Sequence, residues 1–239
     1  MVYEWEDNTV NSRPSRSPRG CRRIFRLDGL HHLDAAYALG HGVIVTSAHF
    51  GAFEMAAFVV TAMGYRPSQI VRPWEDPRAN ALFARQRVQR GVDVIHLGNA
   101  ASGSLRALRQ GRIVAILADI DYTQRDDRTL FMGGEARLPI GPARLSIKTG
   151  APVVPFFVSR LSDRRYSLRF CPPIVPTAGT SLEAIREQIV KVLEEAILEN
   201  PHLWILFFDF WDCELSLDLA RKGFAVLEQS GKKRDLTAV

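Results

Sequence analysis

The sequence predicts an α/β fold in which helices flank a mostly parallel central sheet. Short apolar runs with the composition of β-strands alternate along the chain with longer segments that have helical spacing or helix-capping residues. Elements that alternate in this way are joined by right-handed crossovers, which give parallel strands covered by helices on both faces. With 239 residues, 46% of them hydrophobic and 24% charged, the chain is globular in composition and long enough to bury a large core.

Strands are predicted from short runs rich in β-branched and aromatic residues. Residues 43–47 read VIVTS, and residues 113–119, IVAILAD, have the continuous apolar character of a strand buried on both faces. Residues 165–171 alternate in polarity and are expected to pair with the strand before them. The full set covers residues 43–47, 69–71, 92–97, 113–119, 152–158 and 165–171.

Helices are predicted between these strands and after the last of them. Asp76 followed by Pro77 is typical of an N-cap with proline at the first helical position, and Gly91 ends that helix. In the clearest helix, Thr180 and Glu183 are expected to form a capping box. One face of that helix carries the apolar residues Leu182, Ile185, Ile189, Val192, Leu193, Ala196 and Ile197. The other helices are expected at residues 54–63, 102–110 and 142–149.

Polar tails are expected on either side of one domain at residues 27–215. Residues 1–26 interleave arginine with serine and proline, which indicates a flexible basic tail or a peripheral anchor for anionic lipid. Residues 216–239 are expected to form a second polar tail. The formal net charge of +5 fits acidic partners, such as a phospholipid surface, a phosphorylated substrate or an acidic carrier protein.

The cysteines argue against a zinc site. Cys21, Cys171 and Cys213 are far apart and belong to no CxxC motif, which is typical of reduced thiols in a cytoplasmic protein. The first ten residues are polar and acidic, and no signal peptide is visible in them.

Two ionisable residues, His49 and Glu54, interrupt the apolar run VIVTSAHFGAFEMAAF. Residues five apart on a continuous helix diverge by about 140°, so the two side chains can meet only if His49 precedes the helix. Gly51 loosens the backbone at that point, and His49 follows a predicted strand, at the edge where parallel sheets place their sites. A carboxylate on one imidazole nitrogen leaves the other nitrogen as a base, so the pair is typical of an acid–base couple.

The same stretch has other interpretations. The pair could be a buried, mutually satisfied histidine and glutamate without chemistry. Residues 43–64 are long enough to span a bilayer, but two ionisable groups near the centre make that costly. The chain lacks both GxSxG and HExxH, which leaves no sign of a serine hydrolase or a zinc peptidase.

Four segments, in order, resemble the bacterial lipid A late acyltransferases within the lysophospholipid acyltransferase superfamily. SAHFGAFEMA is similar to that family's HFGNWE version of the HxxxxD/E block, and VRPWEDPRAN is similar to its arginine–proline block. ILADIDYTQ through GPARLSIKTGAPVVPFF resembles the central block with its ADQ motif. NPHLWILFFDFW occupies the place of the tryptophan-rich block. Such ordered blocks are far more specific than the His–Glu spacing alone.

The resemblance implies a glycerolipid acyltransferase-like fold and an O-acyltransferase without a cofactor. His49 would be the general base and Glu54 its orienting partner. The other implied site residues are Arg72, for an acceptor phosphate or an oxyanion, and Gly51, Asp119, Gly141 and Arg144 as further substrate-binding candidates. Phe156, Phe157 and residues 204–211 are candidates for lining an acyl channel.

The implied substrates are an acyl thioester, on acyl carrier protein or coenzyme A, and a glycolipid or lysolipid. The implied place is the cytoplasmic face of the inner membrane, as a peripheral protein that binds the membrane surface and no nucleic acid. Two rival functions stay open. Asp119 and Asp121 form a DxD pair, which in glycosyltransferases holds a metal-bound nucleotide diphosphate. The domain could also be a non-catalytic lipid or carrier-protein binder.

Overall fold

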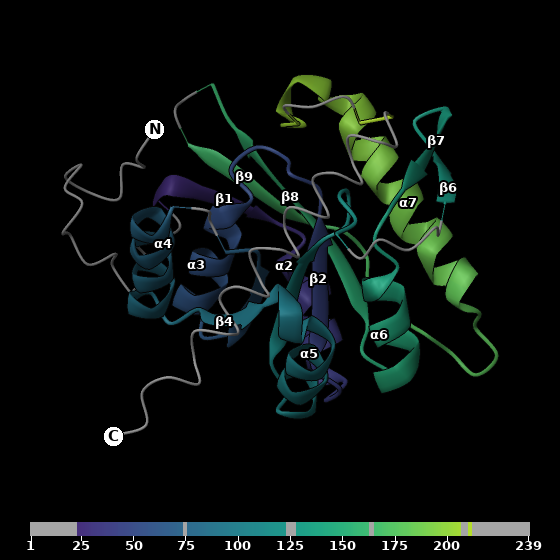
Figure 1. The fold of residues 1–239 in the computed structure, drawn as a ribbon, viewed down its shortest axis with the longest axis horizontal. Coiled ribbons are helices and arrows are strands. Elements are labelled where there is room, and N and C mark those ends of the chain that lie inside the picture. The colour runs from purple at the N-terminus through teal and green to yellow at the C-terminus, as the bar shows by residue number, and fades with distance from the viewer. Residues whose placement is uncertain (1–22, 74–75, 123–127, 163–164, 207–209, 212–239) are drawn as a thin grey trace.

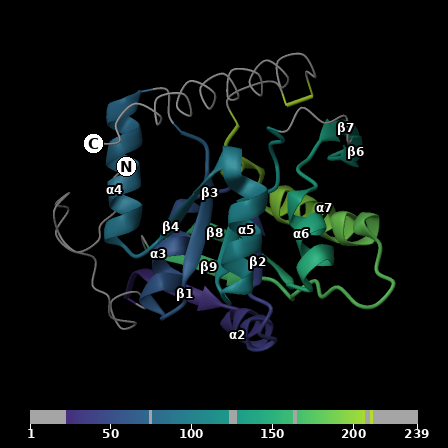
Figure 2. The same ribbon diagram turned by 60° about the horizontal axis from the view of Figure 1, so that its bottom comes forward.

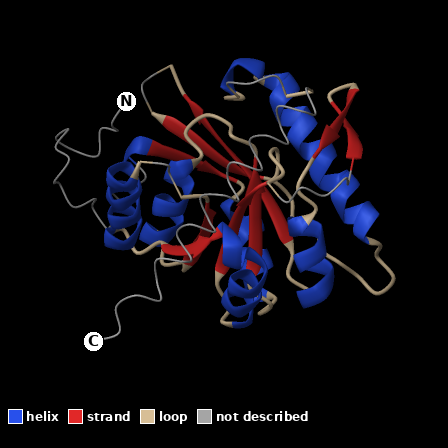
Figure 3. Ribbon diagram, in the orientation of Figure 1, coloured by secondary structure: helices blue, strands red, loops and turns tan. Residues whose placement is uncertain are grey.

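The computed structural model describes residues 23–73, 76–122, 128–162, 165–206 and 210–211, which contain a seven-stranded sheet in the order β1-β9-β8-β2-β5-β3-β4 (Figures 1 and 3). A separate two-stranded hairpin consists of β6 and β7. The strands are β1 (Phe25–Asp28), β2 (Val43–Ser47), β3 (Pro67–Val71), β4 (Asp93–His96), β5 (Ile113–Leu117), β6 (Arg128–Phe131), β7 (Gly134–Arg137), β8 (Val153–Arg160) and β9 (Tyr166–Phe170).

Strand directions confirm the mostly parallel sheet. Strands β8, β2, β5, β3 and β4 share one direction, because each pairs with its neighbour in parallel. Strand β9 pairs antiparallel with β8 in the register Val158↔Leu168, as its alternating sequence predicts, and β1 lies parallel beside β9 at the sheet edge. The central strand β2 is buried at all five positions, which agrees with its apolar, β-branched start VIV, and its last two residues, Thr46 and Ser47, are buried polar side chains.

Helices lie on both faces of this sheet (Figure 2). On one face, buried residues of α2 and α3 pack in a cluster with Val43 and Val45 of β2. On the other face, α5, α6 and α7 pack in a second cluster with Ile44. The helices are α2 (Leu30–Ala38), α3 (Glu54–Ala62), α4 (Pro77–Gln89), α5 (Ala100–Arg109), α6 (Gly141–Thr149) and α7 (Leu182–Glu199), with short 3₁₀ turns η1 (Leu97–Asn99) and η2 (Pro201–Leu203).

The helix N-termini confirm one capping prediction and correct another. Asp76 caps α4, because its carboxylate accepts a hydrogen bond from the backbone N–H of Arg78 at 2.8 Å. The predicted capping box on α7 is wrong. The N-cap is Ser181, whose hydroxyl accepts from the backbone N–H of Ala184, whereas Thr180 lies one residue earlier and bonds to Thr177.

Several elements have no counterpart among the sequence predictions. Strand β1 begins at Phe25, inside the stretch expected to be a tail. The sequence does not predict this strand, because two of the four residues in FRLD are charged. Helix α2 follows Gly29, which has a φ of 69° and provides no side-chain cap. The β6–β7 hairpin lies against α7, where the Met132 backbone N–H donates to Glu194 Oε1 at 2.6 Å (Figure 1). Residues 1–22 and 212–239 lie outside the described residues, and they include most of the predicted N-terminal tail and all of the predicted C-terminal tail.

Among the helices of the described residues, none combines the length and the apolar character that a membrane crossing requires. Residues 43–64, long enough to span a bilayer, instead form strand β2, a turn and helix α3.

Candidate active site

His49 and Asp119 are brought together by the register of two neighbouring strands. Strands β2 and β5 pair in parallel with Ser47 opposite Leu117, and the backbone N–H of Ala118 donates to the carbonyl of Ser47 at 2.8 Å. His49 and Asp119 each lie two residues beyond these paired positions. Both therefore lie at the carboxyl edge of the sheet, where ligands of open α/β sheets bind.

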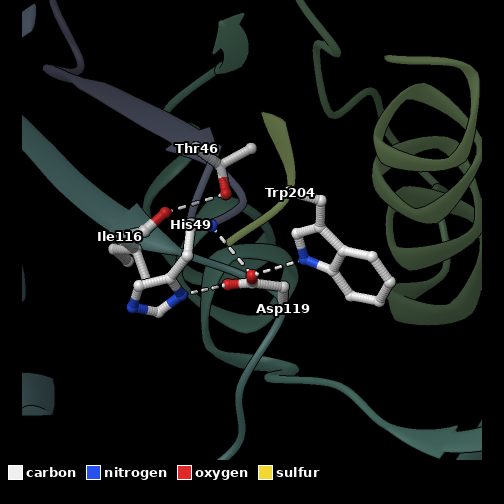
Figure 4. A network of polar contacts seen from close by, with 5 residues as sticks. All are labelled: Thr46, His49, Ile116, Asp119 and Trp204. Carbon is white, nitrogen blue, oxygen red and sulfur yellow. Dashed lines mark hydrogen bonds and ion pairs between the residues drawn. The ribbon is translucent and has the colours of Figure 1, made fainter. Parts of the chain in front are cut away.

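The carboxylate of Asp119 holds both the ring and the backbone of His49 (Figure 4). Its Oδ1 lies 2.8 Å from His49 Nδ1, and its Oδ2 accepts the His49 backbone N–H at 2.8 Å. The Asp119 side chain is fully buried, whereas 26% of the His49 side chain is exposed. One residue before each of the paired ends, the Thr46 hydroxyl of β2 donates to the carbonyl of Ile116 in β5 at 2.9 Å, which adds a side-chain bond between the two strands (Figure 4).

A third donor to Asp119 comes from the far end of the chain. The Trp204 indole N–H donates to Asp119 Oδ2 at 3.0 Å. The backbone around Trp204 pairs with the turn that follows β2, because Gly51 N–H donates to the carbonyl of Leu203 and Ile205 N–H donates to that of His49. The tryptophan-rich block of the sequence is thus part of the site.

Glu54 bonds to Arg87 and not to His49 in this structure, which differs from the predicted pairing. Glu54 lies in the first turn of α3, and its Oε1 accepts from Arg87 Nη2 of α4 at 2.9 Å. The Arg87 Nε also donates to Gln69 of β3, so Glu54 belongs to a network that joins α3, α4 and the sheet. The physical reason is the strand register, which places the Asp119 carboxylate against His49 Nδ1, while the turn directs Glu54 toward α4.

Gly51 is explained by backbone geometry. Its φ is 55°, and a Cβ at this position would lie 2.0 Å from the carbonyl oxygen of Val158 in β8. Only glycine fits a left-handed conformation at so close an approach. Because the Gly51 amide already bonds to Leu203, the predicted role in substrate binding stays a prediction.

Arg72 lies beside Tyr122, next to the same edge of the sheet. Its guanidinium carbon is 5.4 Å from the centre of the Tyr122 ring. Burial raises the pKa of Tyr122; the positive charge of Arg72 opposes this shift, and the negative charge of Asp119 adds to it. The Tyr122 hydroxyl is therefore close enough to both Arg72 and Asp119 to feel their charges. The predicted arginine thus lies near the His49–Asp119 pair.

Gly141 and Arg144 belong to the first turn of α6. Both are exposed, and the backbone N–H of Arg144 donates to the carbonyl of Ile140. The end of α6 leads into Val153, which pairs with Ile44 at the start of β2, so the first turn of α6 points toward the carboxyl edge of the sheet. Their roles in substrate binding stay predictions.

The aromatic residues proposed for an acyl channel separate into two groups. Phe156 and Phe157 are each 4% exposed and pack in the core, where Phe157 contacts Phe50. The rings of Phe131, Phe210 and Trp211 surround Trp204, and Phe131, Trp204 and Phe210 share one hydrophobic cluster with Phe157. Phe156 and Phe157 are part of the hydrophobic core in this structure, and their place along an acyl channel stays a prediction.

A metal-dependent role for Asp119 does not fit this geometry. Both of its oxygens accept hydrogen bonds from protein N–H groups, and its side chain is fully buried. Within the described ranges, His, Cys, Asp and Glu side chains form no group of three or more that could hold a metal ion. The DxD interpretation therefore loses the carboxylate on which it depends.

The pairing of His49 with Asp119 was missed by sequence reasoning, although a signal was present. VIVTSAH and IVAILAD each place a polar residue two positions past the end of a strand. Strands of equal length that pair in parallel bring such residues side by side. The bond from Trp204 has no comparable signal, since it depends on how the chain after α7 returns to the sheet.

Comparisons with known proteins show which family the chain resembles. A family model described as bacterial lipid A biosynthesis acyltransferase matches residues 1–212. The chain is 26% identical over 194 residues to a phosphatidylinositol mannoside acyltransferase of Mycobacterium tuberculosis, covering 80% of this chain and 61% of that protein. It is 24% identical over 211 residues to a lipid A biosynthesis palmitoleoyltransferase of Escherichia coli, covering 86% of this chain and 64% of that protein.

The chain thus spans less than two thirds of the length of these relatives. Among solved structures, the 1-acyl-sn-glycerophosphate acyltransferase PlsC from Thermotoga maritima aligns with a TM-score of 0.47 and 14% identity, covering 79% of this chain and 78% of that one.

Proposed function

Because the chain belongs to the bacterial lipid A biosynthesis acyltransferase family, we propose that it transfers a fatty acyl group from an acyl thioester to a hydroxyl group of a glycolipid or lysolipid. One observation carries the proposal: the imidazole of His49 is fixed by a buried carboxylate and is itself partly exposed at the carboxyl edge of the sheet. This is the arrangement of a general base that is oriented from behind and open to substrate in front.

The proposed reaction starts with the proton on Nδ1 of the neutral ring. The Asp119 carboxylate can only accept, so it selects this tautomer and leaves Nε2 with a lone pair. Nε2 takes the proton of the acceptor hydroxyl while its oxygen bonds to the thioester carbonyl carbon. The C–S bond then breaks, and the thiolate receives the proton from the imidazolium, which Asp119 stabilises in between. No covalent enzyme intermediate forms.

Arg72 is the candidate for handling negative charge. Its guanidinium lies beside Tyr122, which is in electrostatic contact with Asp119. From there it would bind a phosphate of the acceptor or stabilise the oxyanion that develops on the thioester carbonyl. Glu54, which the resemblance gives a catalytic role, is proposed to act by holding Arg87 and thereby α4 beside α3.

The names of the relatives support a glycolipid acceptor. One acts on phosphatidylinositol mannoside and another belongs to lipid A biosynthesis, and both substrates are membrane glycolipids. We propose that the chain works as a peripheral protein at the cytoplasmic face of the inner membrane. The donor would be acyl carrier protein or acyl-coenzyme A, and the net charge of +5 suits both acidic donors and anionic lipid.

The test is acyl transfer from labelled acyl carrier protein, with acyl-coenzyme A in parallel, onto extracted membrane lipids. We expect one labelled lipid with wild type and none with His49→Ala. His41→Ala is the matched control, because His41 is exposed just before β2, at the opposite end of the strand. Transfer that survives in His49→Ala would refute the base. The absence of transfer from both donors with wild type would favour a non-catalytic lipid or carrier-binding domain.

A further inference from the structure

Trp204 closes a ring of contacts around the His49–Asp119 pair. Its indole N–H donates to Asp119 Oδ2, the same oxygen that accepts the His49 backbone N–H. Its own backbone lies opposite Phe50 in a β-bridge, between the two hydrogen bonds that join Leu203 and Ile205 to the turn after β2. The ring runs from His49 to Asp119, on to Trp204 and back to the His49 backbone, so none of the three can move alone.

The Trp204 ring is held in turn by its aromatic neighbours. It contacts Phe131 edge to face at 5.7 Å, Phe210 at 5.0 Å and Trp211 at 6.4 Å between ring centres. Phe131 is fully buried in the β6–β7 hairpin, which anchors the cluster to the folded domain. The direction of the indole N–H is therefore fixed by packing, and it points at the carboxylate (Figure 4).

We infer that Trp204 is a positioning residue for the transfer reaction, which acts through Asp119 to hold His49 Nδ1–H and keep Nε2 available as the base. The inference rests on the proposed function. With the indole donor removed, Oδ2 keeps only the His49 backbone N–H, and the carboxylate can rotate about its Cβ–Cγ bond. Rotation takes Oδ1 out of line with Nδ1, so the preference for the Nδ1–H tautomer weakens.

Trp204 could act through its indole N–H or only through the packing of its ring, and a matched pair of variants separates these two roles. Trp204→Phe keeps an aromatic ring and removes the N–H. Trp211→Phe makes the same chemical change in the same cluster, at an indole that is 45% exposed. We expect Trp204→Phe to lower kcat about tenfold, the usual effect of losing one hydrogen bond to a charged group, with KM unchanged. Trp211→Phe keeps the bond between Trp204 and Asp119 and alters only the packing beside the Trp204 ring, so its kcat should fall less than that of Trp204→Phe.

A second readout does not depend on turnover. In ¹⁵N-histidine-labelled protein, with the His49 signals assigned by their loss in His49→Ala, the ring should be the Nδ1–H tautomer in wild type and in Trp211→Phe. In Trp204→Phe it should become a mixture of both tautomers. This measurement stands even if wild type transfers no acyl group from either donor, so failure of the proposed function and failure of the inference are distinguishable.

Two results would overturn the inference: a His49 spectrum of Trp204→Phe identical to that of Trp211→Phe, or a rise in KM with kcat intact, which would indicate direct substrate contact instead. If Trp204→Phe does not fold, benzothienylalanine at position 204 replaces the N–H by sulfur while retaining the shape of the ring. The same spectrum then decides, with the mixed tautomer supporting the inference and the pure Nδ1–H tautomer refuting it.

Discussion

Asp119→Asn is the change that tests the site most directly. The carboxylate accepts three hydrogen bonds, two at Oδ2 and one at Oδ1. An asparagine has a single carbonyl oxygen. If this oxygen takes the position of Oδ2, it accepts from two donors, the His49 backbone N–H and the indole N–H of Trp204. The amide NH₂ then faces Nδ1, which must become an acceptor.

The magnitude follows from the tautomer. With Nδ1 as acceptor, the ring proton moves to Nε2, and the nitrogen that should take the hydroxyl proton is blocked. A base in the wrong tautomer typically loses a factor of about 10⁴ in kcat. The substitution replaces a charged acceptor by a neutral one, but the His49 backbone N–H and the Trp204 indole N–H keep an acceptor. The free energy of unfolding should therefore fall by only about 2 kcal/mol.

Glu54→Gln is the comparison that makes this prediction decisive. The Glu54 side chain is 37% exposed, and a glutamine oxygen can still accept from Arg87. We expect kcat to fall less than about tenfold, as for a lost surface ion pair that leaves the reacting groups in place. The assay is single-turnover transfer from the acyl thioester, at a temperature at which both variants are fully folded. If Glu54→Gln lost as much activity as Asp119→Asn, Glu54 would be the orienting acid and our assignment would be refuted.

Three further changes test the surroundings of the site. Gly51→Ala should lower the free energy of unfolding by about 3 kcal/mol, because the new Cβ meets a backbone carbonyl, whereas Gly40→Ala, with a φ of 80° and open space, should cost about 1 kcal/mol in the same denaturant titration. Arg87→Met should cost about 2 kcal/mol and lower α4 protection in hydrogen exchange, since Glu54 loses its partner; unchanged protection would contradict the network. The raised pKa of Tyr122 means that the folded state holds this proton more tightly, so stability should fall as pH rises above about 10. In Tyr122→Phe, the free energy of unfolding measured between pH 9 and about pH 11 should fall less steeply than in wild type. An equally steep fall would contradict this role of Tyr122.

The fold was predictable where local pattern and tertiary role agree. Strand β2 and the antiparallel pair β8–β9 follow from composition and alternation, because burial on two faces or one imposes that pattern directly. Strand β1 was missed because an edge strand of four residues with two charges buries too little to require an apolar sequence.

The site was predictable in part for a related reason. The position of His49 directly after a strand predicts it as a site residue. Asp119 was predicted as a substrate-binding candidate, but not as the partner of His49. Spacing suggested Glu54 as the partner because it is near in sequence, whereas strand pairing decides which residues are near in space. Trp204 bonds to a residue 85 positions away, and no local pattern encodes such a contact.

The ring of contacts around Asp119 also sets when the site can exist during synthesis. His49 and Asp119 are 70 positions apart, and Trp204 lies 85 positions beyond Asp119. A nascent chain emerging from the ribosome would complete the β2–β5 pairing well before the segment after α7 becomes available. Long-range contacts of this kind form late, because they close long loops. In the unfinished chain the Asp119 carboxylate would therefore hold His49 less firmly, and full transfer activity would arrive when the segment around Trp204 docks.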